Sequence, residues 1–87
     1  MISIKAIINN ETGLHARPAT QVVTQAAKFK SSITFQKKEK SINAKSIMGV
    51  LSLGLVKGDE LIVTADGEDE AQAVALLKSL IEESFSD

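Results

Sequence analysis

The stretch ISIKAIINNETGLHARPATQVVTQAAK (residues 2–28) changes its hydrophobic period halfway along. Apolar side chains first stand at every second position, at Ile2, Ile4, Ala6 and Ile8. They then recur with spacing i, i+3, i+4, i+7, at Ala19, Val22, Val23 and Ala26. A period of two is typical of a half-buried strand, and the second spacing is typical of an amphipathic helix. The segment therefore predicts a strand over residues 2–8, turn residues, and a helix over about residues 16–28.

Proline sets the start of that helix. Pro18 has no backbone N–H, and a helix tolerates this only in its first turn. The helix is therefore expected to begin between His15 and Arg17, which places the histidine at its N-terminal end. Gly13, two residues before His15, allows a close approach of the backbone.

The same pattern continues to the end of the chain. Further strands are expected in SSITFQ (residues 31–36), KSINA (residues 40–44) and ELIVTA (residues 60–65). KKEK (residues 37–40) must turn tightly between two of them, although it lacks the glycine or asparagine that usually marks a hairpin. A short helix is expected after Ser46 as N-cap and is ended by Gly54. A closing helix is expected in residues 66–85, with Asp69 as its cap and Gln72 in capping-box register.

The predicted order is βαββαβα, in one domain over residues 1–87. The predicted fold class is α+β, with one antiparallel sheet and helices packed on one of its faces. A chain of 87 residues buries a single core but leaves little room for a deep internal cleft. A reactive site would therefore lie at the surface, and a partner protein would supply most of the pocket.

Composition narrows the possible functions. Apolar residues make up 44% of the chain, whereas aromatic residues make up only 3%, so the core must be aliphatic. The chain has no cysteine and one histidine, which excludes disulfides and argues against a metal site. The lack of Trp and Tyr argues against single-stranded nucleic-acid binding. No apolar run is long enough to span a membrane, and residues 1–10 lack the features of a signal peptide. We therefore expect a cytoplasmic protein without membrane insertion.

Charge is distributed unevenly. Residues 1–44 carry seven Lys or Arg and two Asp or Glu, a sum of +5, whereas residues 45–87 carry three and nine, a sum of −6. The two halves could simply expose solvated faces of opposite sign. Alternatively, the basic half meets an acidic partner surface, which would accelerate their encounter.

His15 and Arg17 carry the chemistry of the first helix start. The first N–H groups of a helix have no partner within the helix, and its dipole is positive there. This potential favours the neutral imidazole, which keeps a lone pair for nucleophilic attack. The same N–H groups, at Ala16 and Arg17, together with the guanidinium of Arg17, would suit a phosphoryl group. On spacing alone, a lone histidine near a helix start is more often a cap or a surface residue.

The motifs GLHARPAT (residues 13–20) and NAKSIMGVLSLGL (residues 43–55) together resemble HPr, the histidine-containing phosphocarrier family of the bacterial phosphoenolpyruvate:sugar phosphotransferase system. The resemblance covers essentially the whole chain. It implies an open-faced β-sandwich of four antiparallel strands with three helices on one face. It also implies a monomeric phosphocarrier without cofactor or metal, and not an enzyme in its own right. His15 would accept a phosphoryl group on Nδ1 from enzyme I and pass it to sugar-specific IIA domains, while Arg17 would steady the phosphoryl oxygens.

The second motif supplies a serine with two possible roles. By spacing, Ser46 is the N-cap of the short helix. By resemblance to the low-GC bacterial type of HPr, Ser46 is also phosphorylated by HPr kinase/phosphorylase. Phosphoserine carries about −1.5 to −2 charges at pH 7. The modified protein would then recruit a catabolite control protein.

The short helix is also expected to carry a docking surface. Ile47 and Leu51 could be core residues, but a marginal helix cannot bury every apolar side chain. Methionine suits a surface that fits several partners. We therefore expect Met48, with Ile47 and Leu51, to form an exposed apolar patch near His15, with Thr20 at its edge.

Three alternatives remain open at this stage. The chain could be a purely regulatory HPr-like module that acts through Ser46, although the presence of His15 argues against this. It could serve a nitrogen-regulatory pathway, against which KSIMG (residues 45–49) argues. A nucleic-acid binder is disfavoured by the modest basic excess.

Overall fold

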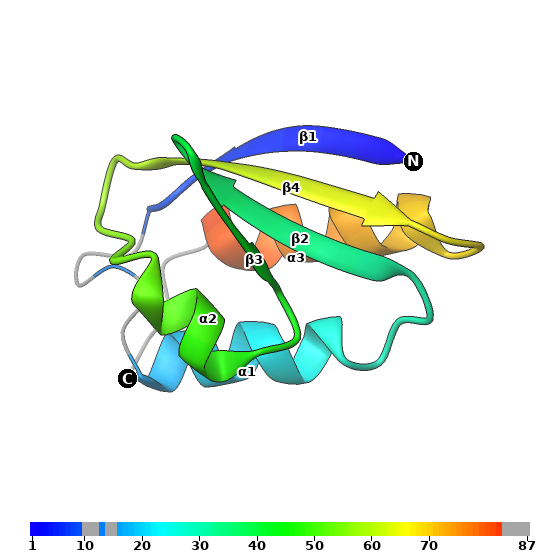
Figure 1. Cartoon of the computed structure of the whole chain (residues 1–87), viewed down its shortest axis with the longest axis horizontal. Coiled ribbons are helices and arrows are strands. Elements are labelled where there is room, and N and C mark those ends of the chain that lie inside the picture. The colour runs from blue at the N-terminus through cyan, green and yellow to red at the C-terminus, as the bar shows by residue number, and fades with distance from the viewer. Residues whose placement is uncertain (10–12, 14–15, 83–87) are drawn as a thin grey trace.

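The structure is a computed structural model that describes residues 1–9, 13 and 16–82, with the side chains of Ala16 and Arg17 outside the description. In chain order, its elements are β1 (Ile2–Ile7), α1 (Ala16–Ala26), β2 (Ser32–Lys37), β3 (Lys40–Asn43), α2 (Ile47–Ser52), β4 (Glu60–Asp66) and α3 (Glu70–Glu82). The four strands form one antiparallel sheet in the order β1-β4-β2-β3. The helices lie on one side of this sheet, below and behind it in Figure 1. The predicted βαββαβα order and the open-faced sandwich are confirmed.

The core lies between the sheet and the helices and, among the described residues, its buried side chains are aliphatic apart from Phe35, as the low aromatic content predicted. Alternate residues of each strand point into it, so Leu61, Val63 and Ala65 of β4 are buried between exposed or half-exposed neighbours. Phe35 of β2 is the largest fully buried side chain. Ala19 and Val22 bury the apolar side of α1. Burying one side chain of the size of leucine or phenylalanine stabilises the fold by about 1.5–3 kcal/mol.

Pro18 lies in the first turn of α1 and is buried, as its missing N–H required. The first helix and the first strand both end earlier than predicted. The α-helical part of α1 ends at Ala26 instead of Lys28, because Lys28 N–H bonds to Gln25 O (3.1 Å) in a tighter final turn. The first strand ends at Ile7, although Ile8 is buried and its N–H still bonds to Asp59 O (2.9 Å).

The hairpin between β2 and β3 has a turn of two residues, because Lys37 pairs directly with Lys40. Lys38 takes a φ of +55°, the conformation that glycine or asparagine usually supplies at such a turn. Lys37 Nζ donates to Gly54 O (3.1 Å), and Lys40 Nζ donates to Ser52 O (2.9 Å). Both lysines therefore hold the hairpin against the C-terminal end of α2, where carbonyl groups lack helical partners and attract cations.

Asp69 lies at the predicted N-cap position of the closing helix, because its C=O accepts from Ala73 N–H (3.0 Å), but its side chain bonds elsewhere. The Asp69 carboxylate accepts hydrogen bonds from the N–H groups of Lys30 (2.8 Å) and Ser31 (2.9 Å) and from the Ser31 hydroxyl. It therefore fastens the loop before β2 to α3. The side chain that reaches back over the helix start is Glu70, which accepts from Gly67 N–H (3.1 Å). Sequence spacing could not show that the backbone amides of Lys30 and Ser31 bind the Asp69 carboxylate in place of the amides at the start of α3.

Candidate functional site

The N-terminal end of α1 is positioned by the residues after α2. Gly13 is buried and has a φ of +72°. A Cβ atom at this position would lie 2.3 Å from Leu55 O and 2.9 Å from Val56 Cα, so only glycine fits. The close approach that Gly13 allows is made to the backbone of Leu55 and Val56. Gly13 therefore lies directly against the segment that follows α2.

Hydrogen bonds fix that segment in turn. Asp59 accepts from Val56 N–H (2.9 Å) and pairs with Lys37 Nζ (2.8 Å). The Lys37 ammonium, with the Val56 amide, holds the pKa of Asp59 below its usual range. The Asp59 carboxylate, which is ionised at neutral pH, thus links the segment that contacts Gly13 to the β2–β3 hairpin.

His15 lies outside the described residues, so the role expected for it stays a prediction. Arg17 is the second residue of α1, which places its backbone in the first turn, but its side chain also lies outside the description. Thr20 is exposed one turn further on, and its carbonyl accepts from Thr24 Oγ1 (2.8 Å). The start of α1 at Ala16 agrees with the predicted position of the histidine immediately before the helix.

Ser46 is the N-cap of α2. Its backbone is extended (φ −108°, ψ 116°), and its Oγ accepts from Gly49 N–H at 3.1 Å. Gly54 follows the last turn with a φ of +60°, as the sequence predicted for the end of this helix. The capping role of Ser46 is confirmed; its phosphorylation stays a prediction.

The exposed apolar residues near α2 form a surface defined by Met48, Leu51 and Val56, which we call the α2 patch. Their side chains are 74%, 38% and 56% exposed, respectively. Ile47 differs from the expectation, because it is half-buried and packs against the core. The sequence analysis did not include Val56 in the patch. The glycines at the two ends of GLVKG (residues 54–58) indicate an exposed loop and could have pointed to it. Since α1 packs against α2 and Gly13 contacts Val56, this patch adjoins the start of α1.

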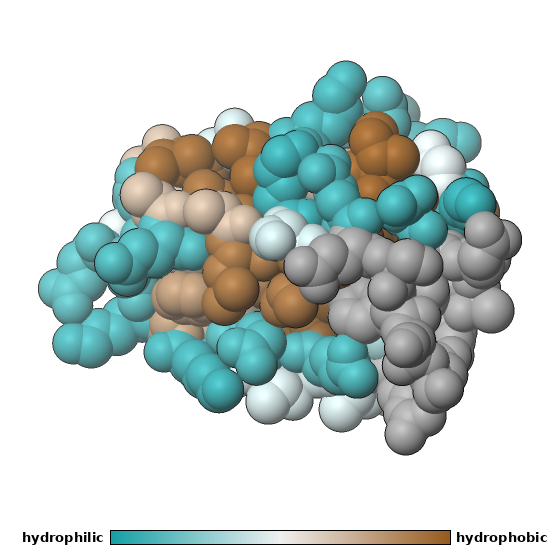
Figure 2. Space-filling model, turned by 180° about the vertical axis from the view of Figure 1, so that it is seen from behind, coloured by the Kyte–Doolittle hydropathy of each residue, from teal (hydrophilic) through white to brown (hydrophobic). Residues whose placement is uncertain are grey.

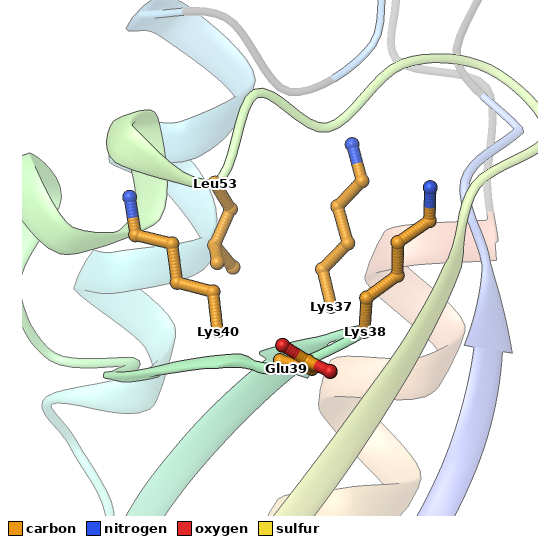
Figure 3. Close-up of a pocket in the computed structure, with 5 residues that line it drawn as sticks. All are labelled: Lys37, Lys38, Glu39, Lys40 and Leu53. Carbon is orange, nitrogen blue, oxygen red and sulfur yellow. The ribbon is translucent and has the colours of Figure 1, made fainter.

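A hollow of about 410 Å³ lies beside the β2–β3 hairpin and is lined by Lys37, Lys38, Glu39, Lys40 and Leu53. Figure 3 shows the three lysine side chains extending in the same direction past Leu53. Two of these ammonium groups bind the carbonyl groups at the end of α2. The hollow is therefore the surface of a structural contact.

Within residues 1–9, 13 and 16–82, no three His, Cys, Asp or Glu side chains are grouped so that they could hold a metal ion. None of the helices in this part of the chain combines the length and the apolar character that crossing a membrane requires.

The fold defines the class of protein, a small open-faced sandwich with one antiparallel sheet, and here an exposed apolar patch adjoins the start of α1. The sequence matches, over residues 2–83, the family model described as the phosphorylation site of the HPr component of the phosphotransferase system. The chain therefore belongs to the HPr family of phosphocarrier proteins.

Solved structures agree with this assignment. HPr-C-His from Thermoanaerobacter tengcongensis, seen in a crystal structure, is 48% identical, with a TM-score of 0.90 over 94% of this chain and 92% of that one. A second crystal structure of that HPr is a dimer, with a TM-score of 0.74 over 94% of each chain. The histidine-containing phosphocarrier protein of Mycoplasma is 42% identical, with a TM-score of 0.85 over 91% and 90% of the two chains. The Bacillus subtilis catabolite-repression protein Crh is 40% identical over the whole of both chains, with a TM-score of 0.76, and forms a swapped, intertwined dimer.

Proposed function

We propose that this protein carries a phosphoryl group on His15 between enzyme I, which is charged by phosphoenolpyruvate, and the IIA domains of sugar permeases. The observation that carries the proposal is the family match over residues 2–83 in a chain whose single histidine is His15, within GLHARPAT. The start of α1 at Ala16 supports it, because the histidine then immediately precedes the unpaired N–H groups of a helix.

The transfer needs little chemistry from the carrier itself. The lone pair of neutral His15 Nδ1 attacks the phosphorus of the phosphorylated donor, and the donor P–N bond breaks as its imidazole takes back the electron pair. The N–H groups of Ala16 and Arg17 and the Arg17 guanidinium would compensate the charge on the phosphoryl oxygens. A shallow site stabilises the phosphoryl group weakly, which suits a group that must move on to the next protein.

Partner docking is assigned to the α2 patch with Thr20 and Ile47. Met48 and Leu51 expose apolar surface to solvent, and a flexible methionine adapts to differently shaped partners. Enzyme I, IIA domains and HPr kinase/phosphorylase would share this surface. Phosphorylation of Ser46 would place a dianion at the edge of the patch, which would weaken docking of acidic partners and favour a basic partner such as the catabolite control protein.

The test is transfer from phosphoenolpyruvate. With enzyme I and phosphoenolpyruvate, the wild-type protein is expected to gain one acid-labile phosphate, measured by intact-protein mass spectrometry. His15→Ala should gain none, whereas Ser46→Ala, the matched control, should be labelled as the wild type is. Equal labelling of the His15→Ala variant would refute the assignment.

The likeness to Crh favours a second candidate function, a regulatory module that acts only through Ser46. The two functions are separated by incubation with HPr kinase/phosphorylase and ATP, and by sugar uptake in a strain that lacks its own carrier. A phosphocarrier restores uptake and depends on His15, whereas a purely regulatory module gains acid-stable phosphate on Ser46 and does not restore uptake.

A further inference from the structure

The loop of residues 55–59, which follows α2, holds the chain before the histidine at two points. Ile8 exchanges two backbone hydrogen bonds with this loop, because its N–H donates to Asp59 O (2.9 Å) and its C=O accepts from Gly58 N–H (2.8 Å). Figure 1 shows the loop, in yellow-green, beside the end of β1. Gly13, two residues before the histidine, packs against the backbone of the same loop. The 55–59 loop therefore fixes Ile8 and Gly13 together.

One carboxylate oxygen sets the shape of the 55–59 loop. Asp59 Oδ2 accepts from Val56 N–H (2.9 Å), and Asp59 N–H donates to Val56 O (3.0 Å), so these two residues close a turn on each other. The same Oδ2 pairs with Lys37 Nζ at 2.8 Å. Lys37 Nζ also donates to Gly54 O (3.1 Å), immediately before the loop, and Figure 3 shows its side chain reaching toward this part of the chain. Lys37 and Asp59 therefore join the two ends of the 55–59 loop.

The pair of Lys37 and Asp59 is sheltered from solvent. Hydrophilic side chains project into solvent around the outline of the molecule in Figure 2, and those of the ion pair between Lys5 and Glu60 are 57% and 63% exposed. The side chains of Lys37 and Asp59 are only 22% and 23% exposed. Partly buried charges are screened less than exposed ones. This pair therefore holds the loop more firmly than a surface ion pair would.

We propose that Asp59 and Lys37 are positioning residues for phosphoryl transfer, which hold the 55–59 loop in the shape that places Gly13 and, through it, the histidine. The inference rests on the proposed function, because it concerns the same site. Both residues act through the loop and not on the phosphoryl group. A misplacement of about 1 Å at a reacting group can slow a reaction about 100-fold, so a small change of loop shape is enough to affect the rate.

The test follows single-turnover transfer from phosphorylated enzyme I to each variant, which gives a rate at saturation and an apparent affinity. Asp59→Ala removes the acceptor of Val56 N–H and the partner of Lys37. Its saturating rate should fall about tenfold, whereas the apparent affinity should change little, because Met48 and Leu51 remain in place. Asp59→Asn keeps an oxygen that accepts from Val56 N–H and should recover part of the loss. A wild-type rate in Asp59→Ala overturns the proposal.

Lys37→Met and Lys40→Met form the matched comparison. Each removes one positive charge and one hydrogen bond to the end of α2, at Gly54 O and Ser52 O respectively. Lys37→Met also breaks the pair with Asp59 and should slow transfer, whereas Lys40→Met should transfer at the wild-type rate. In the double variant Asp59→Ala with Lys37→Met, the loss should be smaller than the product of the two single losses, because both changes break one pair. A loss equal to that product, or equal slowing by Lys40→Met, overturns the proposal.

Nuclear magnetic resonance separates the positioning role from the proposed function. At a temperature where circular dichroism shows the variant folded, the amide resonances of Ile8 and Gly13 should shift in Asp59→Ala and stay in place in Lys40→Met. Unshifted resonances in Asp59→Ala overturn the positioning role, even where transfer is slow. A wild type that enzyme I does not label refutes the proposed function instead, and the Gly13 resonance still decides the positioning. Should Asp59→Ala fail to fold, Asp59→Asn takes its place, and shifts of smaller size are then expected.

Discussion

Replacing Gly13 by alanine tests whether the approach of the N-terminal loop to the end of α2 stabilises the fold. Two costs act on the variant. Alanine at a φ of +72° costs about 1–2 kcal/mol, because its Cβ crowds the following carbonyl. The new Cβ would also lie 2.3 Å from Leu55 O, a backbone atom that no change of rotamer can move. Forced overpacking of this kind costs about 1–3 kcal/mol more.

Gly54→Ala is the matched control for the backbone cost. Gly54 has a similar φ of +60°, but a Cβ there would meet no atom within 4 Å. The control should therefore lose only about 1–2 kcal/mol. In a domain of this size, 1 kcal/mol shifts Tm by about 4–8 °C. The excess loss of Gly13→Ala, about 1–3 kcal/mol, predicts a Tm lower than that of Gly54→Ala by about 4–24 °C.

Thermal unfolding followed by circular dichroism measures both variants under the same conditions. A second readout is phosphoryl transfer from enzyme I, which should slow in Gly13→Ala at a temperature where that variant is still folded, because the chain before His15 must shift. Equal Tm values for the two variants would show that the backbone at Leu55 moves away from the new Cβ without a cost in stability. The close approach at Gly13 would then not stabilise the fold.

The remaining predictions concern a cap and a loop. Ser46→Ala removes the acceptor of Gly49 N–H and should cost about 1 kcal/mol, or about 4–8 °C in Tm, whereas Ser46→Asp keeps a capping oxygen; equal melting of the two variants would contradict the capping role. The bonds from the Ser31 hydroxyl and the Lys30 amide lower the pKa of Asp69 from 3.8 to about 2. Because the folded-state pKa is depressed, this contribution to stability is complete above pH 3.8 and is lost as the pH falls through about 2. Between pH 3.8 and about 2, the free energy of unfolding should therefore fall more steeply for the wild type than for Asp69→Asn. An equal fall in the two proteins would contradict the stabilising role of the Asp69 carboxylate.

Local sequence decided the type and order of the elements. The change of period in residues 2–28, the position of Pro18 and the Ser46 and Gly54 pair at the ends of α2 each depend on neighbours within a few positions. Such signals are local, so they could be read directly, and the element order and the sheet with its helices on one face were predicted correctly. The role of His15, inferred from its place beside the expected helix start and from the resemblance to HPr, stays a prediction.

Only the tertiary structure decided which distant groups share a hydrogen bond. Asp69 has the spacing of a helix cap, yet it binds the amides of Lys30 and Ser31, because folding brings an unpaired loop to the start of α3. Ile47 was expected in the exposed patch but is half-buried, because α2 packs its side chain against the core. Lys78 and Glu82 cover the edge of β1 from more than seventy residues away (the Lys78–Lys5 separation is 73). Local pattern fixes the elements since it depends on near neighbours, whereas these contacts depend on how the packed elements are placed in space.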